Sequence, residues 1–335
     1  MVVMTRLKLW HCAVLTIVLW PIEWGWAVGE EQHNEAKQWL ERMMQATKTL
    51  NYEGSFVYIQ GQSLEAMRIV HNSGIEGERQ HMTSLNGPLR EVVVTNSQVT
   101  CLTPQQQVVF NSGRYKRSAF PISLPHDLNR LESFYAFKMQ GHDRVAGQTT
   151  QVVAIQPRDK LRFGYRLWLD QETALVLRSA LMDEQEQVVE QMMFTHVQLT
   201  NSIDPTEPPA SPTSTVATLS SDSNNSPEVE QTPSPWQVTE LPAGFEQIMR
   251  NRLLSASNQQ AINHIVFSDG LITVSVFVEP LQGAEPVLEG PSRMGAMNAF
   301  GTVVNDHQVV VVGEVPAITV QLIASSVHYV QEVNP

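Results

Sequence analysis

The chain has 335 residues, with 34 acidic against 22 basic side chains and a formal net charge of −12. This balance disfavours a general nucleic-acid role, because such proteins need a strongly basic face. Of its two cysteines, Cys12 lies in an N-terminal apolar run that we expect to be removed, so we expect no internal disulfide and stability from apolar cores. The length is sufficient for two domains of ordinary size.

Residues 1–27 have the three parts of a secretory signal peptide. Arg6 and Lys8 precede an apolar run at 9–20, and a small-residue site at 25–27 follows. The apolar run is shorter than the ~20 residues that a transmembrane helix needs. We therefore expect export, cleavage near Val28 and a soluble mature chain with Cys101 as its one thiol, buried in a strand.

Residues 28–200 predict a first domain of one helix followed by many strands. Ala36, Trp39, Leu40 and Met43 recur at helical spacing and predict an amphipathic helix over 34–50. A second, short helix is expected at 124–133. Alternating apolar and polar residues predict strands at 54–60, 66–72, 91–95, 98–103, 107–111, 137–145, 149–156, 162–170, 174–182 and 188–198.

An antiparallel sheet of that size rarely stays flat. The predicted fold class is α+β, with a half-open antiparallel β-barrel over helices in the first domain. Its concave apolar interior is filled either by helices or by a ligand, and the sequence pattern leaves both open.

The stretch 201–235 contains seven prolines and many Ser and Thr, but no aromatic and no basic residue. Such a composition cannot bury enough apolar surface to offset the entropy of ordering it. We expect a disordered linker here.

Residues 236–335 predict a smaller α/β sandwich. We expect helices around 245–253, at 292–299 and at 316–326, where Pro316 stands near the first turn. Strands are predicted at 264–268 and 271–279, joined by a type I′ turn at Asp269-Gly270, and a second hairpin at 301–304 and 308–314 turns at 305–307.

Motifs that would carry catalysis are weak. The ten histidines show no metal-ligand spacing, and 290–295 has one residue too many for a nucleophile elbow. Ser292 is better explained as the N-cap of the predicted helix. We expect no catalytic residue, no metal and no cofactor; a secreted hydrolase acting through Ser292 is the least favoured alternative.

Two basic clusters in the first domain suggest an anionic ligand. They are Arg114-Tyr115-Lys116-Arg117 and 158–162, and ordinary solvated charge is the simpler explanation of both. Alternatively, they form a basic rim around the apolar interior, which would suit an amphiphile with acyl chains and phosphates. Apolar residues could line that interior or fill a core. The predicted lipid-binding set is Phe56, Tyr58, Arg114, Tyr115, Lys116, Arg117, Met192 and Phe194.

Several segments resemble the MucB/RseB family. In the first domain they are 50–58 (LNYEGSFVY) and 85–87 (LNG). In the second domain they are 241–245 (LPAGF), 267–271 (FSDGL), 294–301 (MGAMNAFG) and 311–316 (VVGEVP). The resemblance covers nearly the whole chain after residue 27, apart from the linker.

The resemblance implies a periplasmic negative regulator of an envelope-stress sigma factor. Such proteins bind the periplasmic segment of a membrane-spanning anti-sigma factor and shield it from regulated proteolysis. The resemblance also implies a first domain similar to lipoprotein carriers, which senses lipid or lipopolysaccharide, and a second domain that holds the anti-sigma factor. For the lipid to release the anti-sigma factor, it must bind the free regulator more tightly than the complex, because a ligand that binds both forms equally shifts no equilibrium.

We place the partner surface on segments 264–279 and 292–301. The predicted partner-binding residues are Phe267, Asp269, Arg293, Met294, Met297 and Phe300. The alternative function is a periplasmic lipid or lipoprotein carrier without a regulatory partner. Homo-oligomerisation stays open.

Overall fold

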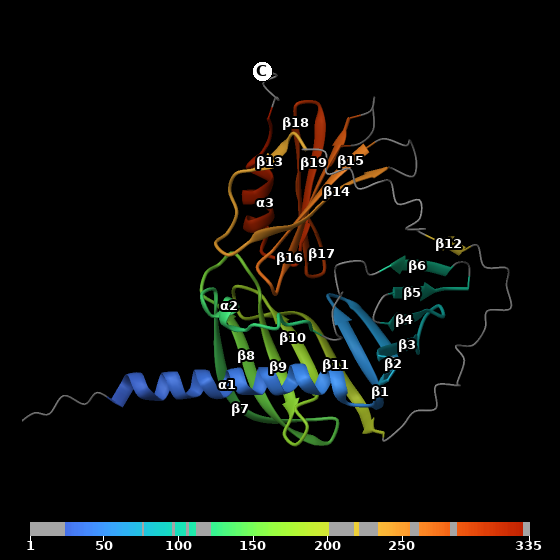
Figure 1. The fold of residues 1–335 in the computed structure, drawn as a ribbon, viewed down its shortest axis with the longest axis vertical. Helices are drawn as coiled ribbons and strands as arrows, with labels where there is room; N and C mark the ends of the chain where they lie inside the picture. Colours follow the sequence, from blue (N-terminus) through green and yellow to red (C-terminus); the bar gives the residue numbers. More distant parts are fainter. Residues whose placement is uncertain are drawn as a thin grey trace, which may run out of the picture.

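The computed structural model consists of a large curved sheet with a smaller sheet unit stacked against one end of it (Figure 1). It describes residues 24–330 except 76, 96–97, 105–106, 112–121, 201–217, 221–233, 255–260 and 282–286. Within this part, side chains are described from residue 32 onward, except at 107–111, 218–220 and 253–254. No helix in this part of the chain is long and apolar enough to cross a membrane.

The large sheet has twelve strands in the order β12-β6-β5-β4-β3-β2-β1-β11-β10-β9-β8-β7 and is not closed. Every neighbouring pair is antiparallel except β12 with β6. The strands are β1 (Tyr52–Gln60), β2 (Ser63–Gly74), β3 (Gly77–Ser84), β4 (Glu91–Thr95), β5 (Gln98–Leu102), β6 (Gln107–Asn111), β7 (Tyr135–Val145), β8 (Gln148–Pro157), β9 (Gly164–Asp170), β10 (Val176–Met182), β11 (Val188–Leu199) and β12 (Thr218–Ser220). The half-open antiparallel sheet expected from the sequence is therefore confirmed.

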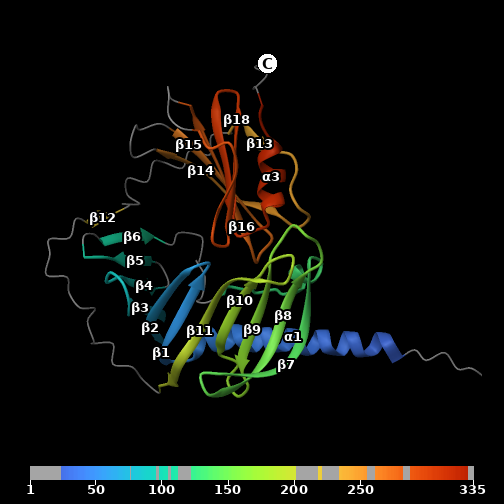
Figure 2. The same cartoon turned by 180° about the vertical axis from the view of Figure 1, so that it is seen from behind.

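Helix α1 (Trp24–Thr49) lies across one face of β7–β11 (Figures 1 and 2). Its Ala36, Leu40 and Met43 are fully buried, as expected for residues that recur every three to four positions on the face toward the sheet. The helix begins ten residues before the predicted start. The predicted signal peptide lies outside the described residues up to position 23, and its removal stays a prediction.

One strand and part of one helix differ from the sequence-based expectation in the first unit. Strand β3 was not predicted, because GERQHMTS has no run of alternating apolar residues, although Gln80 is buried in it. The helix expected at 124–133 is reduced to α2 (Asn129–Glu132). Of the predicted linker 201–235, the structure describes β12 and positions 234–235, so disorder there stays a prediction.

The smaller unit is a six-stranded antiparallel sheet in the order β14-β15-β16-β19-β18-β17, with α3 (Ala317–Ser325) against it. A separate pair, β13 (Trp236–Val238) and β20 (Val327–Tyr329), lies beside α3 (Figure 1). The helix expected at 316–326 is thus confirmed. The strands are β14 (Glu246–Leu254), β15 (Ala261–Ser268), β16 (Thr273–Pro280), β17 (Gly290–Met294), β18 (Met297–Val304) and β19 (His307–Gly313).

Two helices predicted in this unit are wrong. Residues 245–253 form β14, whose register shifts between Gln247 and Met249; this bulge breaks the strict alternation that would have indicated a strand. Residues 292–299 form the β17–β18 hairpin, so Ser292 lies in a strand and is not an N-cap. Gly295, with φ 62°, occupies its tight turn.

The two predicted hairpins are present, but the type I′ turn predicted at Asp269-Gly270 is wrong. Asn305 and Asp306 connect β18 and β19 with φ values of 48° and 58°, as a type I′ turn requires. Between β15 and β16 the connection is four residues long, because Ser268 pairs with Thr273. The carboxylate of Asp269 closes it by accepting hydrogen bonds from the backbone N–H groups of Leu271 and Ile272, at 3.0 and 2.9 Å.

Candidate functional site

A buried ion pair joins the two units at their junction. Arg162 precedes β9 in the first unit, and Asp269 follows β15 in the second. The Arg162 Nη1 atom lies 2.8 Å from Asp269 Oδ2, and both side chains are 0% exposed. A buried charge is costly unless it is paired and hydrogen-bonded. Moving the units apart would separate this buried pair, so the contact favours the observed arrangement of the units.

Further hydrogen bonds cross the same junction. Tyr135 donates its hydroxyl to Asp269 Oδ2 at 2.7 Å, and Arg162 Nη2 donates to the Ala243 carbonyl at 2.7 Å. Thr319 on α3 donates to the Leu161 carbonyl at 2.7 Å. Burial, followed by the adjacent Asp269 carboxylate, raises the pKa of the Tyr135 hydroxyl, so this residue acts there as a neutral donor.

Aromatic rings surround the Arg162 guanidinium. Its Cζ lies 5.0, 5.6 and 5.3 Å from the ring centroids of Phe134, Tyr135 and Phe245, within the range of cation–π attraction. Gly244 permits this packing: it has a φ of 85°, and any Cβ on it would collide with the Phe134 ring. One apolar cluster, which includes Leu131 and Trp236, continues from the first unit into the second.

The β17–β18 hairpin makes a second contact with the first unit. Its Ala296 is fully buried against Phe163 and Leu181, and a Cβ on Gly295 would collide with Gln60. The hairpin tip therefore fits against the ends of β1 and β10.

Two carboxylates from different units influence each other near this contact. Glu190 of β11 accepts a hydrogen bond from Gln60 at 3.1 Å, and Glu314 follows β19. Burial, and then the charge of Glu190, raises the pKa of Glu314. Burial, then a hydrogen bond with Glu190, also raises the pKa of Tyr58. The junction thus combines an attractive pair, Arg162 with Asp269, and a repulsive pair, Glu190 with Glu314.

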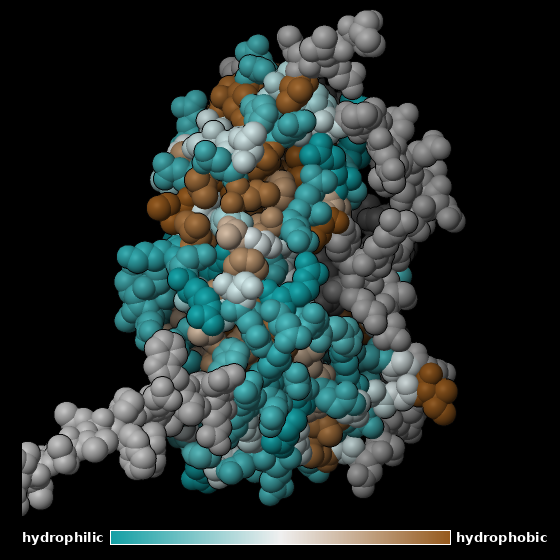
Figure 3. All heavy atoms as spheres, turned by 60° about the vertical axis from the view of Figure 1, so that its left-hand side comes forward, coloured by the Kyte–Doolittle hydropathy of each residue, from teal (hydrophilic) through white to brown (hydrophobic). Residues whose placement is uncertain are grey.

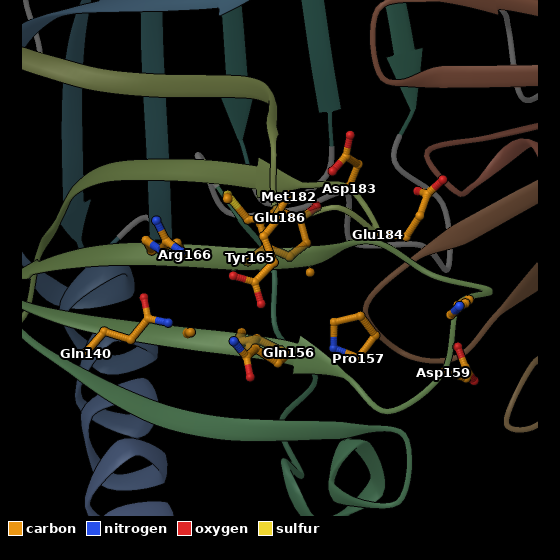
Figure 4. Close-up of a pocket in the computed structure, with 14 residues that line it drawn as sticks. Gln140, Gln156, Pro157, Asp159, Tyr165, Arg166, Met182, Asp183, Glu184 and Glu186 are labelled. Atoms are coloured by element: carbon orange, nitrogen blue, oxygen red, sulfur yellow. The ribbon is translucent and has the colours of Figure 1, made fainter.

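A pocket of about 160 Å³ opens beside the junction, on strands β8, β9 and β10 (Figure 4). The β8–β9 connection that carries Arg162 forms one end of it, because Asp159 lines the pocket and pairs with Arg162 at 3.1 Å. Other residues that line this pocket include Gln140, Ala154, Gln156, Tyr165, Arg166 and Met182.

The predicted lipid-binding residues separate into three groups. Phe56, Met192 and Phe194 are 1–2% exposed and belong to one buried apolar cluster of the large sheet. Tyr58 is half-buried beside Glu190. Residues Arg114–Arg117 lie outside the described residues, so a lipid site built on them stays a prediction.

The predicted partner-binding residues are also divided. Phe267 and Asp269 are buried, and the latter is taken up by the junction. Arg293 and Met294 are exposed on edge strand β17, where Arg293 Nε donates to the Gly295 carbonyl at 2.9 Å. Met297 and Phe300 are half-buried on β18. No contact with a partner tests these six assignments.

An apolar surface lies on the second unit, on the side of α3 (Figure 3). Ile318 on α3 is 59% exposed, and Tyr329 on β20 is 40% exposed. Exposed apolar area of this kind is typical of surfaces that contact other molecules. Sequence analysis did not single it out, because the apolar residues of α3 occur on all its sides.

The sequence indicated that Arg162 and Asp269 are notable residues, but not that they pair with each other. Arg162 belongs to the basic cluster at 158–162, which suggested an external anion, and the structure shows that its anion is internal. The spacing of Asp269 before Gly270 indicated only a turn. Within the described residues, no group of three or more His, Cys, Asp or Glu could hold a metal ion.

Comparison with known families gives two matches along the chain. The model of the MucB/RseB N-terminal domain matches residues 35–212, and that of the MucB/RseB C-terminal domain matches residues 230–328. The sigma factor AlgU regulatory protein MucB of Pseudomonas aeruginosa is 30% identical over 309 residues, covering 90% of this chain and 93% of that protein. The sigma-E factor regulatory protein RseB of Escherichia coli K12 is 26% identical, with 87% and 89% covered.

Solved structures agree with these matches. The complex of Pseudomonas aeruginosa MucA and MucB contains a chain that is 27% identical, with a TM-score of 0.70 over 89% of this chain and 99% of that one. A structure described as MucB in complex with MucA(peri) has a TM-score of 0.69 at 27% identity, with 88% and 99% covered. A crystal structure of MucB has a TM-score of 0.60 at 25% identity, with 88% and 98% covered.

Proposed function

The chain belongs to the MucB/RseB family, and we propose that it is a periplasmic regulator that binds the periplasmic segment of a membrane-spanning anti-sigma factor. In this role it shields that segment from regulated proteolysis, and an amphiphilic lipid or lipopolysaccharide releases it. It acts by binding, not by catalysis, and reaches the periplasm through the signal peptide at 1–27.

The observation that carries this proposal is the likeness to MucB bound to MucA. That likeness extends over both units, at 27% identity and 89% of this chain. It is supported by relatives that are named regulators of sigma factors. Because the chain covers 89–94% of the length of these relatives, the proposal concerns the whole regulator and not one of its domains.

For the partner surface, we keep the exposed edge of the second unit. Arg293 and Met294 on β17 have the required accessibility, since Met294 is 76% exposed. The burial of Phe267 and Asp269 excludes their direct contact with a partner in this arrangement of the units.

The test is calorimetric titration of the protein, from residue 28 onward, with the periplasmic segment of the anti-sigma factor from the same organism. We expect saturable 1:1 binding that weakens when lipopolysaccharide is added. Binding that is indifferent to lipopolysaccharide would retain the partner and remove the lipid signal. No binding to the segment, together with binding of acyl chains, would favour a lipid or lipoprotein carrier.

Two charge reversals on the same sheet test the placement of the surface. Arg293→Glu alters the exposed edge strand β17, whereas Arg252→Glu makes the same change on the opposite edge strand β14. We expect at least tenfold weaker binding for the first variant and a change of less than twofold for the second. Equal effects would place the anti-sigma factor elsewhere.

A further inference from the structure

Two arginines stand side by side on the sheet face that carries the pocket. Arg166 on β9 lies directly opposite Ala180 on β10, and Arg178 lies opposite Trp168. The Arg178 Cζ atom is 4.0 Å from the centroid of the Trp168 ring, and its Nη2 donates to Gln191 at 2.9 Å. This arrangement places two guanidinium groups on neighbouring strands.

Neither guanidinium is fully compensated. Among the described residues, the Nε atoms of Arg166 and Arg178 are buried without a hydrogen-bond partner, and no carboxylate lies within ion-pair distance of either side chain. Burial lowers the pKa of Arg178; the charge of Asp143 opposes this shift, and the like charge of Arg166 adds a smaller lowering. Two adjacent cations without a paired carboxylate favour the binding of an anion where a guanidinium borders open space.

The space for such an anion lies at Arg166. Its neighbours across the strands are Ala154 and Ala180, and Ala154 lines the pocket together with Arg166. The pocket of about 160 Å³ includes Arg166, with Gln140 and Gln156 close to it (Figure 4). At roughly 30 Å³ for each liquid water molecule, this volume holds about five waters, or one small organic group.

The remaining charges of the pocket restrict the anion. Asp159 and Asp183 are engaged, since the first pairs with Arg162 and the second accepts from the backbone N–H groups at 185 and 187. Glu184 and Glu186 are exposed on the turn that follows β10, and Lys160 is the other cation in the lining. These four carboxylates disfavour a doubly charged phosphate more than a singly charged carboxylate.

We propose that this pocket binds a carboxylate attached to an amide, the chemistry of a peptide C-terminus. Arg166 holds the carboxylate through its fork of N–H donors, while Gln140 and Gln156 pair with the adjacent amide, since each carries both a donor and an acceptor. Met182, Ala154 and Pro157 provide the apolar contact for the terminal side chain. The site is independent of the anti-sigma factor and would remain if the regulator function failed.

The probe is N-acetyl-leucine, with N-acetyl-leucinamide as the uncharged analogue, titrated into the full chain from residue 28 onward and followed by NMR. We expect 1:1 saturable binding of the acid and at least tenfold weaker binding of the amide. Arg166→Gln should weaken binding of the acid at least tenfold. Arg68→Gln, which removes the same charge from an exposed residue of β2, should change it less than twofold.

Glu186→Gln removes one exposed carboxylate from the pocket lining and leaves Arg166 unchanged. Because Glu186 lines the pocket and its negative charge repels a bound carboxylate, its removal should tighten binding of the acid two- to fivefold. Equal binding of acid and amide, unchanged binding in Arg166→Gln, or no saturable binding by the native chain would each overturn the proposal. Inorganic phosphate that binds more tightly than the acid, and depends on Arg166, would also overturn the carboxylate assignment.

Discussion

Asp269→Asn is the sharpest perturbation of the junction. Asparagine has the same shape, and its remaining oxygen can still accept from the backbone N–H groups of Leu271 and Ile272. Its amide nitrogen, however, would face the donors of Arg162 and Tyr135, which now bond to Oδ2 at 2.8 and 2.7 Å. Arg162 would keep only the partly exposed Asp159 as a counter-charge.

Removing one partner of a buried ion pair costs about 3–5 kcal/mol. Because Asp159 remains, we expect the lower end of that range, about 3 kcal/mol, in the free energy of unfolding. Urea denaturation followed by circular dichroism measures it. We expect one transition for the native protein and two for Asp269→Asn, because the smaller unit then unfolds first. Small-angle X-ray scattering should report a larger radius of gyration for the variant.

Asp159→Asn is the matched control. Its carboxylate pairs with the same Arg162 at 3.1 Å, but the side chain is 34% exposed, so solvent weakens the interaction. A loss of about 1 kcal/mol or less is expected. If both variants lost the same stability, or if Asp269→Asn lost less than about 1 kcal/mol, the buried pair would not be what holds the units together.

Two other changes at the junction have defined outcomes. Burial and the charge of Glu190 raise the pKa of Glu314 in the folded state, so ionisation of Glu314 destabilises the fold. The protein therefore has its full stability from this group below the ordinary pKa of 4.5, and loses it as the pH rises through the folded-state pKa. Glu314→Gln should therefore raise the urea midpoint at pH 7.5 but not at pH 4, and an equal shift at both would contradict the assignment. Gly244→Ala should lose more thermal stability than Gly61→Ala, because both have positive φ but only the first would also collide with Phe134. Similar losses would show that the Phe134 contact is unimportant.

Most of the fold could be predicted because its signals are local. The alternation in β9 and β11, the helical spacing in α1 and the Asn305-Asp306 turn each depend on a few adjacent residues. For β14 the local pattern predicts a helix instead, because Phe245, Ile248 and Met249 fit helical spacing. The bulge that explains this spacing follows from pairing with β15.

The candidate site depends on contacts that local patterns do not contain. Arg162 and Asp269 are 107 residues apart, and only the folded chain brings them together. Phe56 and Phe194, which belong to the predicted lipid-binding set, pack edge-on at 5.9 Å within a buried apolar cluster, and their role in lipid binding stays a prediction. Their alternation indicated one buried face of the sheet and could not show whether that face was occupied.

The junction also changes the meaning of the covalent connection between the units. Every junction contact described above is made by residues before 201 or after 235, so none of them requires an intact chain between those positions. A protease that cut within 201–217 would yield two polypeptides that remain associated as a non-covalent heterodimer. Loss of the full-length band on a denaturing gel would then be no measure of loss of the assembled protein.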